Sequence, residues 1–273
     1  MSQNRVIKAL GIPRSSLFYI RRGYPEKRIA RRRDLPQEIS TVIREISGNR
    51  GTYGIPRVRA ILKRDHGIAL SKYMVHRIMK EENLLIHRFN TRGPSRTHTG
   101  KIEVATPNTR WASDLTTIKC WNGQKLRFTY VLDCCDRSII SWIAGTHIQS
   151  CDIEKMVQNA LFRRFGENLP AKGQLQFLTD NGPEYIERKL NATLKDWHIE
   201  HCTTPTYSPQ SNGMCEALNG TFKRDYVYEN CLDTPESVYA QIAGWVKTYN
   251  SYAPHSALGM KTPEEFFILK TAA

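Results

Sequence analysis

The sequence contains no apolar run of the roughly 18–20 residues that a membrane-spanning helix needs. Its opening stretch, Met-Ser-Gln-Asn-Arg-Val-Ile-Lys, lacks the pattern of a secretory signal. There are 7 cysteines, but none form a Cys-x-x-Cys pair, and most lie in apolar surroundings. This usage is typical of reduced intracellular cysteine rather than of a disulfide framework or a zinc site. We therefore expect a cytoplasmic protein.

Several arrangements that carry chemistry in other enzymes are also missing. The sequence has no evident Gly-rich phosphate loop, Ser/His/Asp arrangement, internal repeat or low-complexity tract. Its 8 histidines are scattered without metal-ligand spacing, and His198 and His201 are expected to pack or cap near the start of a strand.

Positive charge is abundant but unevenly shared. Residues 1–100 hold 22 Lys and Arg against 7 Asp and Glu, a net charge of +15, whereas residues 101–273 hold 18 against 19, a net charge of −1. This basic N-terminal part of the chain, the basic front (residues 1–100), favours a polyphosphate partner, because each phosphate contact releases condensed counterions. The alternative is a solvated basic surface that serves solubility.

Residues 1–35 are expected to form a basic helical segment. The run Arg31, Arg32 and Arg33 ends it, and such a run is either a solvated linker or an arm that contacts phosphates. We favour the arm, because it precedes a second candidate DNA-binding segment.

Residues 36–85 predict a compact three-helix unit. Apolar residues recur at helical spacing, Pro56 stands at the first turn of the second helix, and Ser71 is a candidate cap for the third. On that third helix we expect Tyr73, Met74, Ile78 and Met79 to pack inward and Lys72, His76, Arg77 and Lys80 to face outward. The pattern fits a helix-turn-helix whose basic helix enters a DNA groove. A three-helix packing unit without DNA contact is the alternative.

After a polar linker at residues 86–110, residues 111–273 change to a pattern of strands and helices. Strands are predicted at 111–119, 126–134, 138–148, 175–179 and 199–202, with turns at Asn122-Gly123 and Asp136-Arg137. Helices are predicted near 152–166, 184–197, 211–229 and 235–251. Three strands linked by hairpins and followed by alternating helix and strand indicate a mixed α/β sheet flanked by helices.

Three acidic residues occupy positions where ligands of a catalytic metal would be useful. Asp114 lies in the first strand, Asp180 ends the fourth, and Glu216 opens a helix after a Pro/Gly/Ser-rich loop, with 35 residues between the last two acids. Hard divalent cations prefer carboxylate oxygens. If the first and fourth strands are adjacent, Asp114 and Asp180 meet. Asp133 is a rival ligand that could instead close a turn.

The helix that begins near Glu216 places Asn219, Gly220 and Lys223 on the same face as the acid. A metal-binding carboxylate with a cation two turns further along suits a scissile phosphate and its neighbours. The alternative is an ordinary surface pairing of Glu and Lys.

In order and spacing, these motifs resemble the DDE transposases of bacterial insertion sequences, in particular a second-reading-frame catalytic subunit with a retroviral-integrase-like core. The resemblance covers almost the whole chain. Its motifs are Trp111-Ala-Ser-Asp114, Leu178-Thr-Asp180-Asn-Gly182, Ser208-Pro-Gln-Ser-Asn-Gly213 ahead of Glu216, Trp245-Val-Lys-Thr-Tyr-Asn250, Pro254-His-Ser-Ala-Leu-Gly259 and Thr262-Pro-Glu-Glu-Phe266.

The resemblance implies a ribonuclease-H-like core with Asp114, Asp180 and Glu216 as catalytic ligands of two Mg²⁺ ions, for which Mn²⁺ can substitute. It implies cleavage and strand transfer at insertion-sequence ends by a homo-oligomer on paired ends, near the nucleoid, with an upstream-frame partner or fusion. Lys223, with Asn219 and Arg224 beside it, is then expected to contact the element end. A plain nuclease and a DNA-binding regulator with an inactive core remain alternatives.

Overall fold

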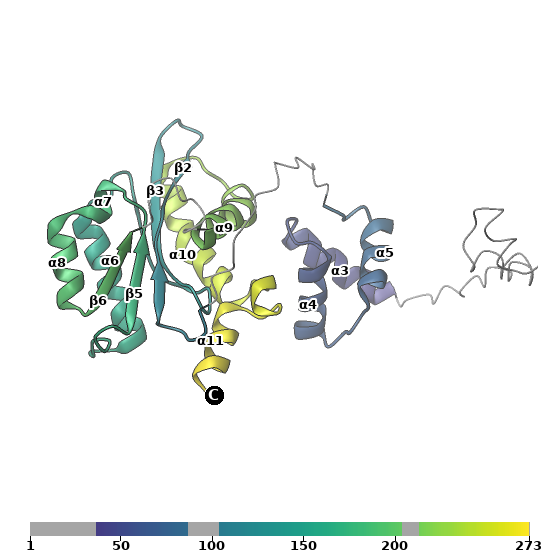
Figure 1. The fold of residues 1–273 in the computed structure, drawn as a ribbon. Helices are drawn as coiled ribbons and strands as arrows, with labels where there is room; N and C mark the ends of the chain where they lie inside the picture. The colour runs from purple at the N-terminus through teal and green to yellow at the C-terminus, as the bar shows by residue number, and fades with distance from the viewer. Residues whose placement is uncertain (1–36, 87–103, 204–212, 273) are drawn as a thin grey trace, which may run out of the picture. The chain divides into compact units, whose positions relative to one another are not determined.

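The computed structural model describes residues 37–86, 104–203 and 213–272 (Figure 1). The basic run Arg31–Arg33 lies outside these residues. By contact density the chain divides into Met1–Thr41 and Val42–Ala273. No helix among the described residues is long and apolar enough to cross a membrane.

Three helices, α3 (Gln37–Asn49), α4 (Ile55–His66) and α5 (Lys72–Glu81), form the predicted three-helix unit. Pro56 stands in the first turn of α4, and the Ser71 hydroxyl accepts the first-turn amide of Met74 in α5 (3.2 Å). The buried stripe of α5 is Val75, Ile78 and Met79. The prediction that Tyr73 packs inward was wrong: its side chain is 72% exposed, since it lies on the far side of the helix from that stripe.

A mixed six-stranded sheet forms the centre of the remaining chain. Its strands are β1 (Arg110–Ala112), β2 (Leu115–Lys119), β3 (Lys125–Asp133), β4 (Ile139–Gly145), β5 (Leu175–Thr179) and β6 (Ile199–Thr203). Strands β2, β3 and β4 form an antiparallel meander, whereas β1, β5 and β6 run parallel to one another. The expected first strand is interrupted at Ser113 and Asp114, so β1 and β2 pair with successive parts of β3.

Helices cover both faces of this sheet, and each face has its own apolar core (Figure 1). Helices α6 (Ser150–Phe165), α7 (Pro183–Ile186) and α8 (Arg188–Asp196) pack on one face. Helices α9 (Gly213–Phe222) and α10 (Pro235–Ser251) pack on the other. The expected mixed α/β architecture is confirmed.

The helices on the second face differ from the prediction at one point, and a side-chain contact ties one of them to the sheet. The helix predicted to run to residue 229 ends as an α-helix at Phe222 and continues as a π-helical turn, η2 (Lys223–Val227). The Asn250 side chain accepts from the Ile139 amide and donates to the Ile139 carbonyl, both at 2.9 Å, so it ties α10 to β4. After a short turn, η3 (Ser256–Leu258), helix α11 (Pro263–Thr271) begins at the capping residue Thr262.

Candidate active site

The strands that carry the first two acids are neighbours, as predicted. Strands β1 and β5 pair in parallel, with Ala112 opposite Leu178, and the Ser113 amide continues the ladder by donating to the Leu178 carbonyl (2.9 Å). Asp114 and Asp180 follow these paired positions by two residues each, so both carboxylates lie at the same edge of the parallel pair.

Burial and the neighbouring carboxylates change the pKa of Asp114. Burial and then the Asp180 carboxylate raise the pKa of Asp114 to about 6, and Glu216 adds a smaller contribution in the same direction. Hydrogen bonds from the Leu115 amide and the Asn219 side chain oppose the shift. Asp114 is half-buried and is repelled by two other carboxylates, and a donor set of three carboxylates suits a hard divalent metal.

The turn after Asp180 holds its carboxylate close to the backbone. Its Oδ1 accepts from the Gly182 amide (3.0 Å). A Cβ atom on Gly182 would lie only 3.1 Å from that oxygen and 3.0 Å from a carboxylate oxygen of Glu184. Glycine therefore permits a close approach that any side chain would crowd.

Helix α9 brings the third acid and an unexpected partner. Glu216 lies exposed in its first turn, and three residues later the Asn219 amide donates to Asp114 Oδ2 (2.7 Å). The buried Tyr130 hydroxyl, which has one proton to donate, lies within hydrogen-bond distance of both Asn219 Oδ1 (3.0 Å) and the Cys215 carbonyl oxygen (3.2 Å). The structure thus directs Asn219 toward Asp114 and Tyr130, and its expected DNA contact stays a prediction.

Within the described ranges 37–86, 104–203 and 213–272, no three His, Cys, Asp or Glu side chains are arranged so that they could hold a metal ion. The carboxylates of Asp114, Asp180 and Glu216 are ligand types that a divalent metal prefers, but the three side chains do not form a closed ligand set in this arrangement.

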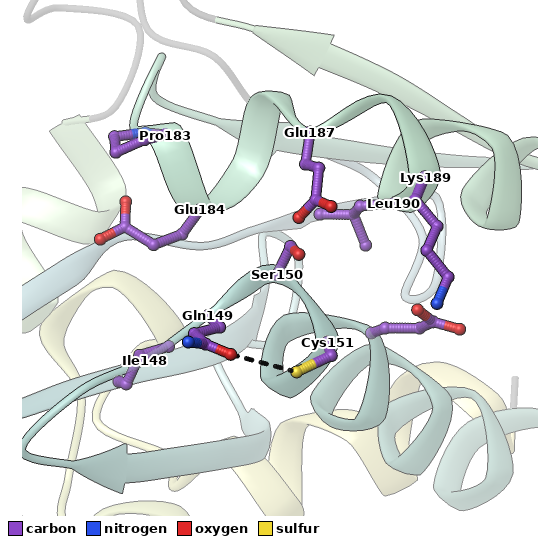
Figure 2. A pocket seen from close by; sticks show the side chains of 10 residues that line it. Ile148, Gln149, Ser150, Cys151, Pro183, Glu184, Glu187, Lys189 and Leu190 are labelled. Carbon is purple, nitrogen blue, oxygen red and sulfur yellow. Dashed lines mark hydrogen bonds between the residues drawn. The ribbon is translucent and has the colours of Figure 1, made fainter.

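A fourth acid near Asp180 escaped the sequence prediction. Glu184, in α7, forms an ion pair with Arg127 of β3 (2.7 Å). It also lines a shallow pocket between the start of α6 and helices α7 and α8 (Figure 2). Glu154 and Glu187 make the rim acidic as well, which disfavours a phosphate there. No local pattern links Arg127 to Glu184, so only the folded chain pairs them.

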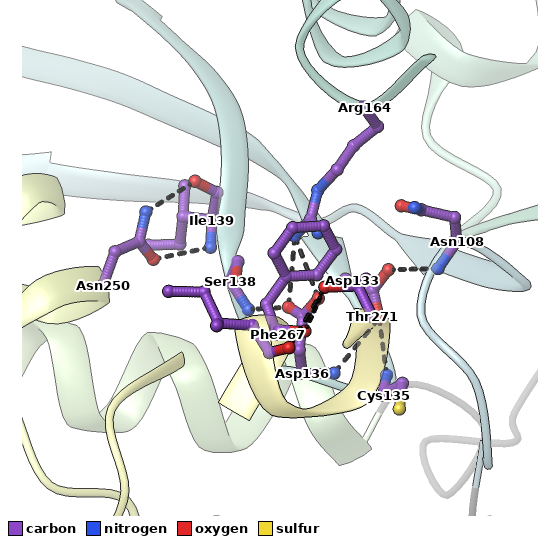
Figure 3. Close-up of polar contacts among 11 residues, drawn as sticks. Asn108, Asp133, Cys135, Asp136, Ser138, Ile139, Arg164, Asn250, Phe267 and Thr271 are labelled. Carbon is purple, nitrogen blue, oxygen red and sulfur yellow. Dashed lines mark hydrogen bonds and ion pairs between the residues drawn. The ribbon is translucent and has the colours of Figure 1, made fainter. Parts of the chain in front are cut away.

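The rival acid Asp133 belongs to a different cluster, shown in Figure 3. Its oxygens accept from the amides of Asn108 (2.7 Å), Cys135 (2.7 Å) and Asp136 (3.2 Å). Burial and the neighbouring Asp136 raise the pKa of Asp133 to about 6. The side chain closes the β3–β4 turn, so the structure favours the structural alternative for it.

Of the other residues expected to contact DNA, some are exposed to solvent and others lie close to an acidic side chain. Lys72 and Lys80 are exposed on α5, whereas Arg77 is half-buried and lies 3.9 Å from Glu81. On the core, Lys223 is half-buried at the start of η2, and the Arg224 guanidinium binds Asp225 at 2.7 and 2.9 Å. Arg224 is therefore held by its neighbouring acid.

The histidines behave as expected. His198 Nδ1 lies 3.1 Å from the Pro170 carbonyl, and His201 bridges Thr179 and Asn191 beside the end of β5. Both contacts are structural.

Comparison with known proteins agrees with this arrangement. Residues 34–88 match the HTH-like domain family, and residues 105–209 and 197–263 match two Integrase core domain families. Transposase InsD of the Escherichia coli insertion element IS2A/D/F/H/I/K is 34% identical over 271 residues, which cover 96% of this chain and 89% of the relative. The InsD transposase of IS2-9 shows the same identity over 87% of its length.

Among solved structures, a chain of the simian T-cell lymphotropic virus intasome in complex with the PP2A regulatory subunit B56 gamma shares the fold. It has a TM-score of 0.50 and 20% identity, and the match covers 77% of this chain and 74% of that one. Together with the acids that follow the adjacent strands β1 and β5, these similarities show that the chain belongs to the DDE transposases of bacterial insertion sequences, polynucleotidyl transferases with an integrase catalytic core.

Proposed function

We propose that Asp114, Asp180 and Glu216 bind two divalent metal ions, with Mg²⁺ as the natural ion and Mn²⁺ as a substitute, and that this site cleaves and joins insertion-element ends. The observation that carries the proposal is the parallel pairing of β1 and β5, which brings Asp114 and Asp180 to the same end of the sheet. Repulsion between the two carboxylates, which raises the pKa of Asp114, favours the binding of a cation there. When bound, the metals would activate the attacking oxygen and stabilise the leaving one.

The chain's own residues would position the reaction. Asp114 and Asp180 follow two hydrogen-bonded parallel strands, so the sheet brings both residues to the same end of the pair. Glu216 would complete the ligand set from α9. Water would be the nucleophile for cleavage and a DNA 3′-hydroxyl for joining, with in-line attack in both steps and no covalent link between protein and DNA.

An assay with labelled element-end DNA distinguishes this function from its alternatives. A transposase yields both cleaved and joined products, a plain nuclease yields only cleaved ones, and a DNA-binding regulator shifts the DNA without either product. We expect both products. Cleavage without joining, with the chain tested alone and with an upstream-frame partner, would favour the nuclease.

We further propose that residues 36–85 deliver DNA to the core at 111–273, that Lys223 and the arm Arg31–Arg33 contact phosphates, and that a homo-oligomer joins paired ends in the nucleoid of the cytoplasm. The 34% identical relative is named a transposase, which supports a DNA partner. We also propose that the chain acts with an upstream-frame partner or as a fusion with it.

Removing two exposed cations of α5 tests the DNA-delivery role. The double variant Lys72→Ala/Lys80→Ala is expected to bind element ends more weakly, and the slope of log affinity against log salt should fall by about 2, because each lost phosphate contact removes roughly one unit. Lys172→Ala/Lys247→Ala removes the same charge from exposed positions of the core and is the matched control. Equal slopes for the two double variants would favour the packing-unit alternative.

Asn219 is proposed to orient Asp114, since its amide donates to that carboxylate at 2.7 Å. In Asn219→Ala, strand transfer is expected to fall by about 10–100-fold, as for other groups that orient metal ligands. Element-end binding should stay near that of the unaltered chain. Weakened end binding with an unchanged rate of joining at saturating DNA would instead support the DNA contact expected from the sequence.

A further inference from the structure

Three buried hydroxyl groups form a closed ring between the segments that carry Asp114 and Asp180. The Tyr185 hydroxyl lies 2.7 Å from Ser113 Oγ and 2.7 Å from Thr129 Oγ1, and the last two atoms are 3.1 Å apart. All three residues are fully buried. Since each hydroxyl donates one hydrogen bond and accepts at least one, the ring satisfies all three groups without water.

The ring joins three elements at the edge where the aspartates meet. Ser113 directly precedes Asp114, in the gap between β1 and β2, and Thr129 lies opposite Leu115 on β3. Tyr185 belongs to α7, which begins at the turn formed by Asp180 and Gly182. The turn that carries one aspartate is thereby held against the strand that carries the other.

The Tyr185 hydroxyl keeps its proton, so its hydrogen bonds in the ring persist. Burial raises the pKa of its hydroxyl above the ordinary value, and the nearby Asp180 and Asp114 charges act in the same direction. The phenol therefore stays protonated and able to donate at neutral pH.

We propose that the hydroxyl ring of Ser113, Thr129 and Tyr185 sets the separation of the Asp114 and Asp180 carboxylates and so tunes the affinity of the site for divalent metal. The inference rests on the proposed metal-binding role of these aspartates. Tyr185 and Thr129 are positioning residues here, because they touch neither metal nor DNA in the proposal.

The experiment measures metal binding separately from catalysis. The melting temperature of the full chain is followed against Mn²⁺ concentration for the unaltered protein, Tyr185→Phe and Thr129→Val, each of which removes one hydroxyl with little change in volume. We expect the half-saturating Mn²⁺ concentration to rise by about 10–100-fold in both variants, the range typical of lost ligand-orienting hydrogen bonds. The half-saturating Mg²⁺ for strand transfer should rise in parallel, with recovery at high metal.

Tyr226→Phe is the matched control. Tyr226 is buried too, but its hydroxyl has no hydrogen-bond partner among the described residues, so its removal should leave the metal response unchanged. Metal titrations of Tyr185→Phe and Thr129→Val that coincide with that of the unaltered chain, or an equal shift in Tyr226→Phe, would overturn the inference. If one of the two ring variants does not fold, the Mn²⁺ titration of the other variant tests the inference. An unaltered chain that does not respond to Mn²⁺ or Mg²⁺ contradicts the proposed metal site itself.

Discussion

Asp180→Asn is expected to reduce cleavage and strand transfer by at least roughly a thousandfold in Mg²⁺. A bound metal contributes several kcal/mol to the stabilisation of the transition state, and about 4 kcal/mol corresponds to a thousandfold in rate. Asparagine has nearly the same shape and retains an oxygen that accepts from the Gly182 amide, so the turn after β5 should persist. The measurement is the rate of product formation on labelled element ends.

Two controls separate lost chemistry from lost folding or DNA binding. Element-end binding by Asp180→Asn should remain near that of the unaltered protein, since the substitution removes a negative charge and leaves the basic front intact. Asp196→Asn makes the same chemical change at an exposed position in α8 and should retain activity. Joining by Asp180→Asn at the unaltered rate would sink the assignment of the site.

The second large effect concerns stability. Arg164 is the cation of the buried cluster in Figure 3: its guanidinium lies 3.0 Å from Asp136 Oδ2, and its side chain is 7% exposed. It also lies 3.9 Å from the centre of the Phe267 ring in α11. Arg164→Met is expected to lower the free energy of unfolding by about 3–5 kcal/mol at neutral pH, because it leaves Asp133 and Asp136 buried without a counter-charge.

The loss should depend on pH in a defined direction. The pKa of Asp133 in the folded protein is already raised to about 6, above its ordinary value, and removing the cation raises it further. A carboxyl group with a raised folded pKa contributes stability below its unfolded pKa and loses it as pH rises through the folded value. The deficit of Arg164→Met is therefore expected to be smaller at pH 5 than at pH 8, as measured by urea unfolding.

Arg188→Met provides the matched comparison, because Arg188 is exposed on α8 and its replacement should change stability by less than about 0.5 kcal/mol. The double variant Arg164→Met/Asp136→Asn should be more stable than Arg164→Met alone, since it removes one of the two stranded charges. Equal stability losses for Arg164→Met and Arg188→Met would show that the buried cluster needs no cation.

Most elements of the fold could be predicted because their signals are local. Strand β5 and helix α10 begin and end as predicted, since β-branched and apolar runs bounded by turn residues fix such boundaries. Two errors have other causes. The π-helical turn η2 has no periodic signature, and Tyr73 was assigned to a helix face that does not match the buried stripe Val75, Ile78 and Met79.

The sequence by itself determined the family, the order of strands and helices, and the three acids with their neighbouring motifs, because these are properties of short segments and of their spacing. Only the tertiary structure decided what surrounds the acids. It joined Asn219 to Asp114 across 105 positions and Tyr185 to Ser113 across 72, and it separated Asp133 from the site. The physical reason is that a hydrogen bond between distant residues depends on strand register and on how helices pack. Neither can be predicted from a short segment of sequence.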